Sequence, residues 1–270
     1  MLRLQGVSYR YPGADGDTLH GIDLELAEGT VTGLAGPSEA GKSTLCLVAG
    51  GLAPRVVGGR LVGEVSLDGA DVAGWPMHQL AEHVVTGLQD PAGQLSLIAD
   101  RVFDEVAFGP ANLGLPRDEV EARAEEALRQ VGIEDLRGRD PVQLSTGQQQ
   151  LVVIAGLLAM RPRYLVLDEP VAHLDAQGTR LVLDAIAGIA ASGTAVLIAE
   201  QRTEALARVC GSLAILAHGN IVARGPVREV LADPATVAMG VEELPELRLR
   251  RLLIAAGLDP ALAEPEAAGR

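Results

Sequence analysis

The sequence predicts an α/β fold with a mostly parallel core sheet and a helical lobe inserted into it. Two continuous apolar runs, Tyr164–Leu167 and Ala195–Ala199, flank a helical stretch at Ala176–Ala190, which is typical of parallel strands buried on both faces. From Asp100 to Gln130 the apolar residues instead recur with a helical period, and the charged residues share one face. Because this segment separates two groups of predicted strands, we expect the lobe to interrupt the sheet.

Shorter strands are predicted on the N-terminal side of this lobe. They are Leu2–Ser8, which alternates like an edge strand, Asp23–Leu26, Val31–Leu34, Val65–Leu67 before a turn at Asp68-Gly69, and Val84–Leu88, which stops at Gln89. Near the C-terminus, the turn His218-Gly219-Asn220 predicts a hairpin. Beyond Met239, a segment rich in Glu, Leu and Ala predicts a helix that passes into a loose end by Pro265.

The bulk composition argues against several classes of function. With 270 residues, 48% of them apolar and only 2% aromatic, the chain can bury an aliphatic core in one domain or two lobes. A net charge of −14 provides no basic field for nucleic acid or anionic lipid, so we expect no nucleic-acid partner. The longest apolar run, Leu151–Met160, is too short for a bilayer and residues 1–5 lack a signal-peptide layout, which predicts a cytosolic chain unless a partner holds it at a membrane. Cys46 and Cys210 lack metal-ligand spacing, which favours buried free thiols.

A glycine-rich loop follows the strand predicted at Val31–Leu34 and leads into a helix from about Lys42. It has the P-loop spacing of Gly, four residues and Gly-Lys-Ser, and its residues are Gly36, Pro37, Ser38, Glu39, Ala40, Gly41, Lys42, Ser43 and Thr44. The glycines let backbone amides turn toward one concavity, and the start of the helix adds a partial positive charge. Lys42 is the only lysine among 22 basic residues, and its compact ammonium suits a position between adjacent phosphates. We therefore expect a nucleoside triphosphate with Mg²⁺ here, with a glycine-rich structural turn as the alternative.

Two carboxylates, Asp168 and Glu169, follow the buried run Tyr164–Leu167. In open α/β sheets, ligands bind beyond the carboxyl ends of the strands. We therefore expect Asp168 to hold Mg²⁺ through water and Glu169 to polarise an attacking water. The alternative for such a pair alone is a surface turn, and the P-loop upstream favours the catalytic interpretation.

The segment Leu144-Ser145-Thr146-Gly147-Gln148 precedes a further helix. Ser145 and the backbone amides through Gly147 suit either the cap of that helix or an external phosphate. Lying between the P-loop and Asp168-Glu169, this segment resembles the signature motif of the ATP-binding-cassette (ABC) ATPases. That motif is usually Leu-Ser-Gly-Gly-Gln and contacts the nucleotide held by the opposite subunit. The resemblance covers the chain from Leu2 to about Leu231.

The resemblance implies the ABC-ATPase fold of the P-loop NTPases. This fold has an antiparallel N-terminal β subdomain, an inserted helical lobe at about 95–160 here, and a C-terminal extension. Residues 1–238 would form the ATPase domain and residues 239–270 the helical extension. The implied ligands are ATP and Mg²⁺.

The resemblance also assigns roles to residues that are ordinary when taken singly. It places Tyr11 against the adenine, Gln89 at the lobe junction beside the metal with Ser43 and Asp168, and Asp175 in coupling across a dimer. The alternatives from the residues alone are a surface aromatic at Tyr11, a polar strand end at Gln89 and a helix N-cap at Asp175. An N-cap and a dimer contact are compatible at Asp175.

Within this family, the chain is most similar to the ATPase subunits of energy-coupling factor (ECF) transporters, which import vitamins and metal ions. The stretches that carry this likeness are residues 9–13, 89–94, 106–114 and 154–160. The likeness implies a membrane scaffold subunit and a separate substrate-binding membrane subunit as partners, with this ATPase peripheral on the inner face of the cell membrane. It further implies that the extension after Met239 helps the ATPases to dimerise.

Three positions depart from the family pattern. Gln201 stands where a switch histidine is usual, Thr146 replaces the first signature glycine, and Leu151 stands where an arginine is common. A glutamine amide still donates a hydrogen bond but does not titrate near neutral pH, so a slow hydrolytic site is one interpretation and a tolerated variant is the other. A homodimer would combine these departures in each nucleotide site, whereas a heterodimer with a regular ATPase would distribute them, so we expect a heterodimer.

Other functions are weighed against transport. A soluble ABC ATPase acting on nucleic acid or ribosomes would need a long insertion or basic surfaces, and only about fifty-five residues separate Gln89 from Ser145. A small-molecule kinase would not need the segment 145–148, and a hydrolysis-impaired regulatory subunit would fit Gln201. In ECF transporters the transported substrate is recognised by a separate subunit, so this sequence does not distinguish a vitamin from cobalt or nickel.

Overall fold

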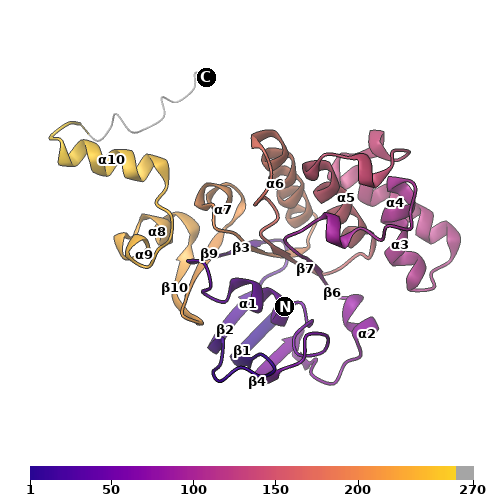
Figure 1. Cartoon of the computed structure of the whole chain (residues 1–270), viewed down its shortest axis with the longest axis horizontal. Coiled ribbons are helices and arrows are strands. Elements are labelled where there is room, and N and C mark those ends of the chain that lie inside the picture. The colour runs from indigo at the N-terminus through magenta and orange to yellow at the C-terminus, as the bar shows by residue number, and fades with distance from the viewer. Residues whose placement is uncertain (260–270) are drawn as a thin grey trace.

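A mostly parallel sheet lies at the centre of the computed structural model, which describes residues 1–259 (Figure 1). Within these residues the sheet has six strands, in the order β10 (Asn220–Pro226), β9 (Ser212–Ala217), β3 (Val31–Ala35), β8 (Ala195–Ala199), β7 (Tyr164–Asp168) and β6 (Val84–Gly87). All neighbouring pairs from β9 to β6 are parallel, while β10 and β9 form an antiparallel hairpin. The predicted parallel core and the predicted hairpin at the turn after Ala217 are confirmed.

A second sheet is formed by the N-terminal strands and is antiparallel. In the described residues its order is β2 (Leu19–Leu26), β1 (Leu2–Arg10), β4 (Arg60–Leu67) and β5 (Ala70–Asp71). The prediction of an edge strand at Leu2–Ser8 is wrong, because β1 pairs with β2 on one side and with β4 on the other. Its alternation reflects one buried and one exposed face, and every strand of a one-sided sheet has that pattern whatever its place in the order.

The central strands bury side chains on both faces of their sheet. Along β7, Leu165 and Leu167 belong to the apolar core beneath the helical lobe, whereas Tyr164 and Val166 belong to the core shared with the antiparallel sheet. Helix α1 (Lys42–Ala49) fills the space between the two sheets with Leu45 and neighbouring apolar residues. Because neither face reaches solvent, the sequence of such a strand is continuously apolar.

The helical lobe is inserted between two strands that lie side by side. Strand β6 ends at Gly87 and its parallel neighbour β7 begins at Tyr164, and between them lie α3 (Val102–Asn112), α4 (Arg117–Val131) and α5 (Thr146–Ala159). Short helix α2 (Met77–Ala81) precedes β6. Helix α4 buries Ala124, Ala127 and Leu128 against the lobe and carries exposed ion pairs on its opposite face. The predicted helical lobe is therefore confirmed.

The remaining helices complete the C-terminal half, and α10 stands away from the body of the molecule (Figure 1). Their bounds are α6 Ala176–Ala191, α7 Thr203–Val209, α8 Val227–Ala232, α9 Pro234–Ala238 and α10 Pro245–Ala255. Helix α10 confirms the helix predicted beyond Met239, while the loose end predicted by Pro265 lies outside the described residues. Across residues 1–259, no helix is long and apolar enough to span a bilayer. Cys46 and Cys210 are buried and unbridged, as predicted.

Candidate active site

The P-loop joins β3 to α1 and depends on glycine at its first position. A Cβ added at Gly36 would lie 2.1 Å from the carbonyl oxygen of Leu216, so a larger residue would displace the backbone of β9. Gly41, with a φ of 103°, caps α1 in a left-handed conformation that only glycine adopts readily. The chain therefore turns sharply and starts the helix at Lys42, where the sequence predicted it. This places the backbone of the loop around one concavity at a helix N-terminus.

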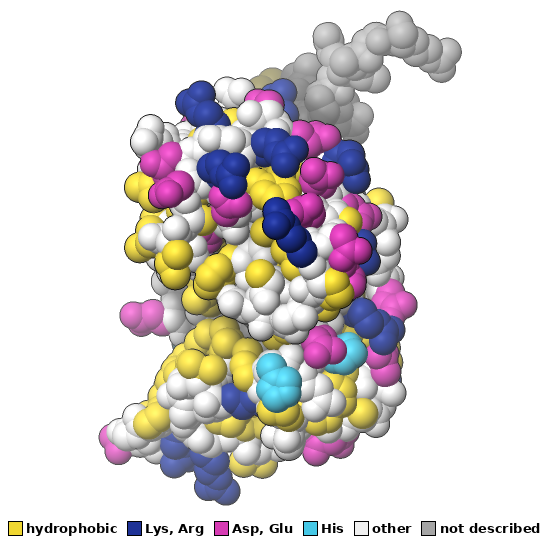
Figure 2. Space-filling model, turned by 90° about the vertical axis from the view of Figure 1, so that its right-hand side faces the viewer, with side chains coloured by type: hydrophobic (Ala, Val, Ile, Leu, Met, Phe, Trp, Pro, Cys, Tyr) yellow, Lys and Arg dark blue, Asp and Glu magenta, His cyan; other side chains and the backbone are white. Residues whose placement is uncertain are grey.

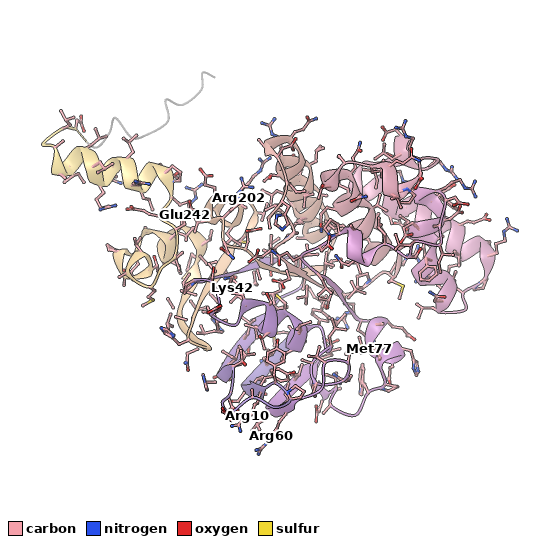
Figure 3. The ribbon with its side chains drawn as sticks, viewed as in Figure 1. Arg10, Lys42, Arg60, Met77, Arg202 and Glu242 are labelled. Carbon is pink, nitrogen blue, oxygen red and sulfur yellow. The ribbon has the colours of Figure 1, made fainter. Side chains whose placement is uncertain are left out.

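Lys42 lies inside this loop, near the junction of the two sheets (Figure 3). Its side chain is only 5% exposed, and Nζ donates hydrogen bonds to the carbonyl oxygens of Gly36 at 2.8 Å and Pro37 at 2.9 Å. Burial lowers the pKa of Lys42, and the nearby acids Glu169, Asp168 and Glu200 oppose that effect. The ammonium is thus kept beside acidic side chains and within reach of a ligand in the loop.

Glu169 lies between two glutamines that come from distant parts of the chain. Its Oε2 accepts a hydrogen bond from Nε2 of Gln89 at 3.0 Å, and its Oε1 accepts one from Nε2 of Gln201 at 2.8 Å. Gln89 lies two residues after the end of β6 and Gln201 two residues after the end of β8, and these strands flank β7. The three residues predicted as catalytic therefore meet beyond the carboxyl ends of three adjacent strands. The backbone of Glu169 has a φ of 47°, an uncommon conformation for a non-glycine residue that is often found at functional sites.

Asp168 ends β7 and is suited to a divalent cation. The residue is 6% exposed, and its buried Oδ1 has no hydrogen-bond partner among residues 1–259. Burial raises the pKa of Asp168, and a hydrogen bond from the Ser43 side chain acts against that rise. An unpartnered buried carboxylate oxygen beside a serine hydroxyl is the oxygen-rich setting that Mg²⁺ prefers. Asp168 and Ser43, two of the three residues predicted for Mg²⁺, thus have the chemistry to hold that ion.

A buried acid, Glu200, was not identified as a site residue by sequence reasoning. It precedes Gln201, is 1% exposed, and its Oε1 accepts hydrogen bonds from the backbone N–H groups of Gln201 at 2.8 Å and Arg202 at 3.2 Å. Burial raises the pKa of Glu200, and the backbone N–H groups of Arg202, Gln201 and Val171 lower it. The only sequence signal was a charged residue at the end of the apolar run Ala195–Ala199.

The P-loop cavity has a volume of about 340 Å³ and is lined by six of the nine predicted P-loop residues. Its lining comprises Thr18, Ser38, Glu39, Gly41, Lys42, Ser43, Thr44, Glu169 and Gln201. Thr18 is a further member that the sequence analysis missed, because nothing in its local sequence marks it. Tyr11 lies beside this cavity, with its hydroxyl 3.0 Å from Oγ1 of Thr44 and its ring edge-on to Tyr9.

The signature segment lies in a different cavity of about 380 Å³. Ser145 caps α5 in a reciprocal arrangement, since its Oγ accepts from the N–H of Gln148 while Oε1 of Gln148 accepts from the N–H of Ser145. Asp175 caps α6 and accepts from the N–H of Gly178 at 2.7 Å. Both caps, together with Thr146 and Gly147, line this second cavity. Within one chain, therefore, the signature residues and Asp175 do not share a cavity with Lys42.

A third cavity, of about 470 Å³, separates the helical lobe from the sheet edge near α2. It is lined by α2 and β6 on one side and by α3 and α5 on the other, mainly with apolar residues such as Met77, Phe108 and Met160. Figure 2 views the molecule from this side and shows hydrophobic side chains gathered in a hollow between its upper and lower parts. Met77 lies at its lower rim, well apart from Lys42 (Figure 3).

Comparison with known proteins gives consistent likenesses. The family model described as ABC transporter matches residues 19–172. The cobalt import ATP-binding protein CbiO of Rhodobacter capsulatus is 38% identical over 245 residues, which are 89% of this chain and 84% of CbiO. A putative ABC transporter ATP-binding protein of Streptomyces coelicolor is 40% identical over 246 residues. The chain spans about two fifths of the length of that relative and of two further curated relatives.

Solved structures agree with these relatives. The structure of cbiO1 from Clostridium perfringens, described as part of the ABC transporter complex cbiONQ, superposes with a TM-score of 0.77 and 30% identity. The match covers 95% of this chain and 98% of cbiO1. A nucleotide-free ATP-binding cassette from an ABC transporter matches with a TM-score of 0.75 and 25% identity, over 90% of this chain and 99% of that chain. These likenesses confirm the fold class predicted from the sequence.

Proposed function

The chain belongs to the ABC transporter family, and from this premise we propose that it binds and hydrolyses ATP to power a membrane importer. The observation that carries the proposal is the position of Glu169, whose carboxylate lies between the amides of Gln89 and Gln201 at the cavity that holds Lys42. Phosphoryl transfer asks mainly for positioning and for stabilisation of charge. This cavity offers a cation, a helix N-terminus and a carboxylate for both tasks.

In the proposed reaction, Lys42 and the P-loop amides bind the β- and γ-phosphates, and the ring of Tyr11 stacks on the adenine. Ser43, Asp168 and Gln89 hold Mg²⁺, which supplies charge neutralisation at the phosphates when bound. Glu169 accepts a hydrogen bond from the attacking water and orients it. Each oxygen of Glu169 already accepts one amide hydrogen bond and keeps a second lone pair, so release by one glutamine would leave that oxygen fully available to water.

Gln201 is the amide that we expect to move. Its side chain donates to Glu169 in this structure. The same N–H groups are suited to an oxygen of a γ-phosphate bound in the P-loop cavity, which Gln201 lines. Transfer of that hydrogen bond from Glu169 to ATP would free one carboxylate oxygen. Hydrolysis would thus become linked to the presence of the γ-phosphate.

We propose that a complete site needs two chains. The P-loop cavity and the cavity that holds Ser145 and Asp175 are separate in this chain, so a head-to-tail pair would bring one of each to every nucleotide. Thr146 places a Cβ and a branched side chain at the start of α5, where a glycine would leave more space for phosphate. In a heterodimer, the second ABC ATPase would carry the usual signature glycine and switch histidine. Thr146 and Gln201 would then lie in different nucleotide sites.

The proposed membrane partners are an integral scaffold subunit and a substrate-binding subunit of ECF type. The apolar lining of the cavity between the lobe and α2 is suited to the apolar face of a partner's helix, and Gln89 lies just beyond β6, which lines this cavity. The likeness to a cobalt import protein and to a subunit of cbiONQ supports a transition-metal ion as cargo, with a vitamin as the alternative. The ATPase unit of residues 1–238 would then be peripheral on the inner face of the membrane, with the extension 239–270 helping the dimer.

A purification and an activity measurement test the proposal together. The chain is tagged in its native host, the membranes are solubilised in mild detergent, and ATP hydrolysis is measured for the recovered complex and for the single chain. We expect a polytopic scaffold, a second ATPase and a small membrane protein to copurify, and turnover to be higher in the complex. Recovery of nucleic-acid or ribosome factors alone would overturn transport, while ATP binding without turnover in every complex would favour a regulatory subunit. Brisk turnover by the single chain would overturn the heterodimer.

A further inference from the structure

Glu200 occupies a position that stability alone does not explain. Its side chain is 1% exposed, and Oε2 has no hydrogen-bond partner within residues 1–259. Burying a carboxylate is costly unless its oxygens are satisfied, and an apolar residue of similar size often stabilises such a site. The charge of Glu200 raises the pKa of Lys42, and the charge of Glu169 raises the pKa of Glu200. A costly buried group next to a proposed catalytic site is a candidate for function.

Two hydrogen bonds accepted by the Glu200 carboxylate hold the turn that carries Gln201. Its Oε1 accepts from the backbone N–H groups of Gln201 and Arg202, so one oxygen holds two successive amides. The backbone N–H of Glu200 donates to the carbonyl oxygen of Leu34 at 3.1 Å, in the strand that leads to the P-loop. At the other end, the Arg202 side chain donates to Oγ1 of Thr179 at 3.2 Å on α6 (Figure 3).

The turn therefore fixes the backbone from which Gln201 reaches Glu169. A glutamine has three side-chain torsions, so the position of its amide is poorly determined unless the backbone beneath it is held. Nε2 of Gln201 lies 2.8 Å from Oε1 of Glu169, which is normal hydrogen-bond distance. The carboxylate of Glu200 binds the backbone of Gln201, and the side chain of Gln201 in turn binds Glu169.

We propose that Glu200 is a positioning residue. It holds the backbone of Gln201 so that the side-chain amide of Gln201 reaches Glu169 in the P-loop cavity. The inference rests on the proposed function, in which Gln201 exchanges Glu169 for the γ-phosphate of ATP. Glu200 touches neither nucleotide nor water in this scheme and acts through Gln201 alone. What matters is its acceptor oxygen, since two backbone amides bind that atom, and its negative charge is secondary.

A matched pair of substitutions separates the hydrogen bonds from the charge. Glu200→Gln keeps an acceptor oxygen and removes the charge, whereas Glu200→Met keeps the length and removes the acceptor. Measured in the complete complex, we expect Glu200→Gln to retain kcat within about threefold and Glu200→Met to lose about 10- to 100-fold, the scale expected for a misplaced catalytic group. KM for ATP should stay within about threefold in both, because Lys42 and the P-loop are untouched. Equal losses in the two variants would overturn the proposal.

A double-mutant cycle distinguishes positioning from general damage to the fold. In a Gln201→Ala background the amide is absent, so adding Glu200→Met should lower kcat by less than about twofold more. A further 10-fold loss there would mean that Glu200 acts elsewhere, and would overturn the proposal. If Glu200→Met does not fold, Glu200→Ala replaces it. The smaller alanine side chain leaves room for water, which can hydrogen-bond the free backbone amides.

Hydrogen exchange tests the inference independently of ATP hydrolysis. In the nucleotide-free chain, Glu200→Met should speed exchange of the backbone amides of Gln201 and Arg202 by at least about tenfold, and Glu200→Gln should leave both slow. Unchanged exchange in Glu200→Met would overturn the positioning role. Absence of turnover in the wild-type complex would instead overturn the proposed function, while the exchange result would still decide whether Glu200 holds the turn.

Discussion

Replacing Glu169 by glutamine tests the centre of the proposed site. The wild-type carboxylate accepts hydrogen bonds from two amides, at 3.0 Å and 2.8 Å. In Glu169→Gln one oxygen becomes an NH₂ group, so one neighbouring glutamine must turn its own amide to accept instead of donate. The change replaces two hydrogen bonds to a charged group with two neutral ones, which costs about 1–2 kcal/mol in total for groups this exposed. For a chain of this size that corresponds to a fall in Tm of about 2–8 °C.

Catalysis should respond far more than stability. Without a carboxylate to orient the attacking water, we expect kcat to fall by at least about 10²-fold, while ATP still binds at Lys42 and the P-loop. The variant should therefore accumulate as an ATP-bound closed dimer, which size-exclusion chromatography detects. The assay is phosphate release from the complete complex, with Glu121→Gln as the matched control, since Glu121 is an exposed acid paired with Arg117 on α4. Turnover of Glu169→Gln within threefold of wild type would refute the assigned role.

Three further predictions concern Lys42, Gln201 and the two cysteines. Lys42→Ala should weaken ATP binding by at least about 100-fold in a fluorescent-nucleotide titration, because the buried ammonium is the one cation lining the P-loop cavity in the described residues; retained affinity would contradict the phosphate site. Gln201→His should raise kcat about tenfold and add a pH dependence near pH 6.5, where histidine titrates and glutamine does not; a flat pH profile with unchanged turnover would show that glutamine is a tolerated variant. Burial raises the pKa of the Cys210 thiol to about 12 and also raises the pKa of Cys46, so the reactive thiolates are scarce at pH 8 and become available when unfolding restores the ordinary, lower pKa. An aromatic disulfide reagent should therefore label neither cysteine in the native chain and both in denaturant, and rapid native labelling would contradict their burial.

Local patterns in the sequence predicted those parts of the fold that depend on local chemistry. The P-loop was recognisable because each of its residues serves a nearby backbone requirement, such as the space beside Leu216 that admits only Gly36. The strands β7 and β8 were recognisable because burial on both faces leaves a continuous apolar run. The place of β1 in its sheet was not, since alternation reports which face is buried and not which strands lie on either side.

The sequence by itself determined which residue types were available for the chemistry, and the tertiary structure decided which of them meet. Gln89, Glu169 and Gln201 follow three adjacent parallel strands, and only the strand order brings their side chains within hydrogen-bond distance. The same order leaves Ser145 and Asp175 in a separate cavity, which sequence spacing does not show. The burial of Glu200 is also visible only in three dimensions, because it depends on neighbours that are remote in sequence. A local motif specifies a backbone conformation, whereas a catalytic geometry is a set of distances between segments that packing alone brings together.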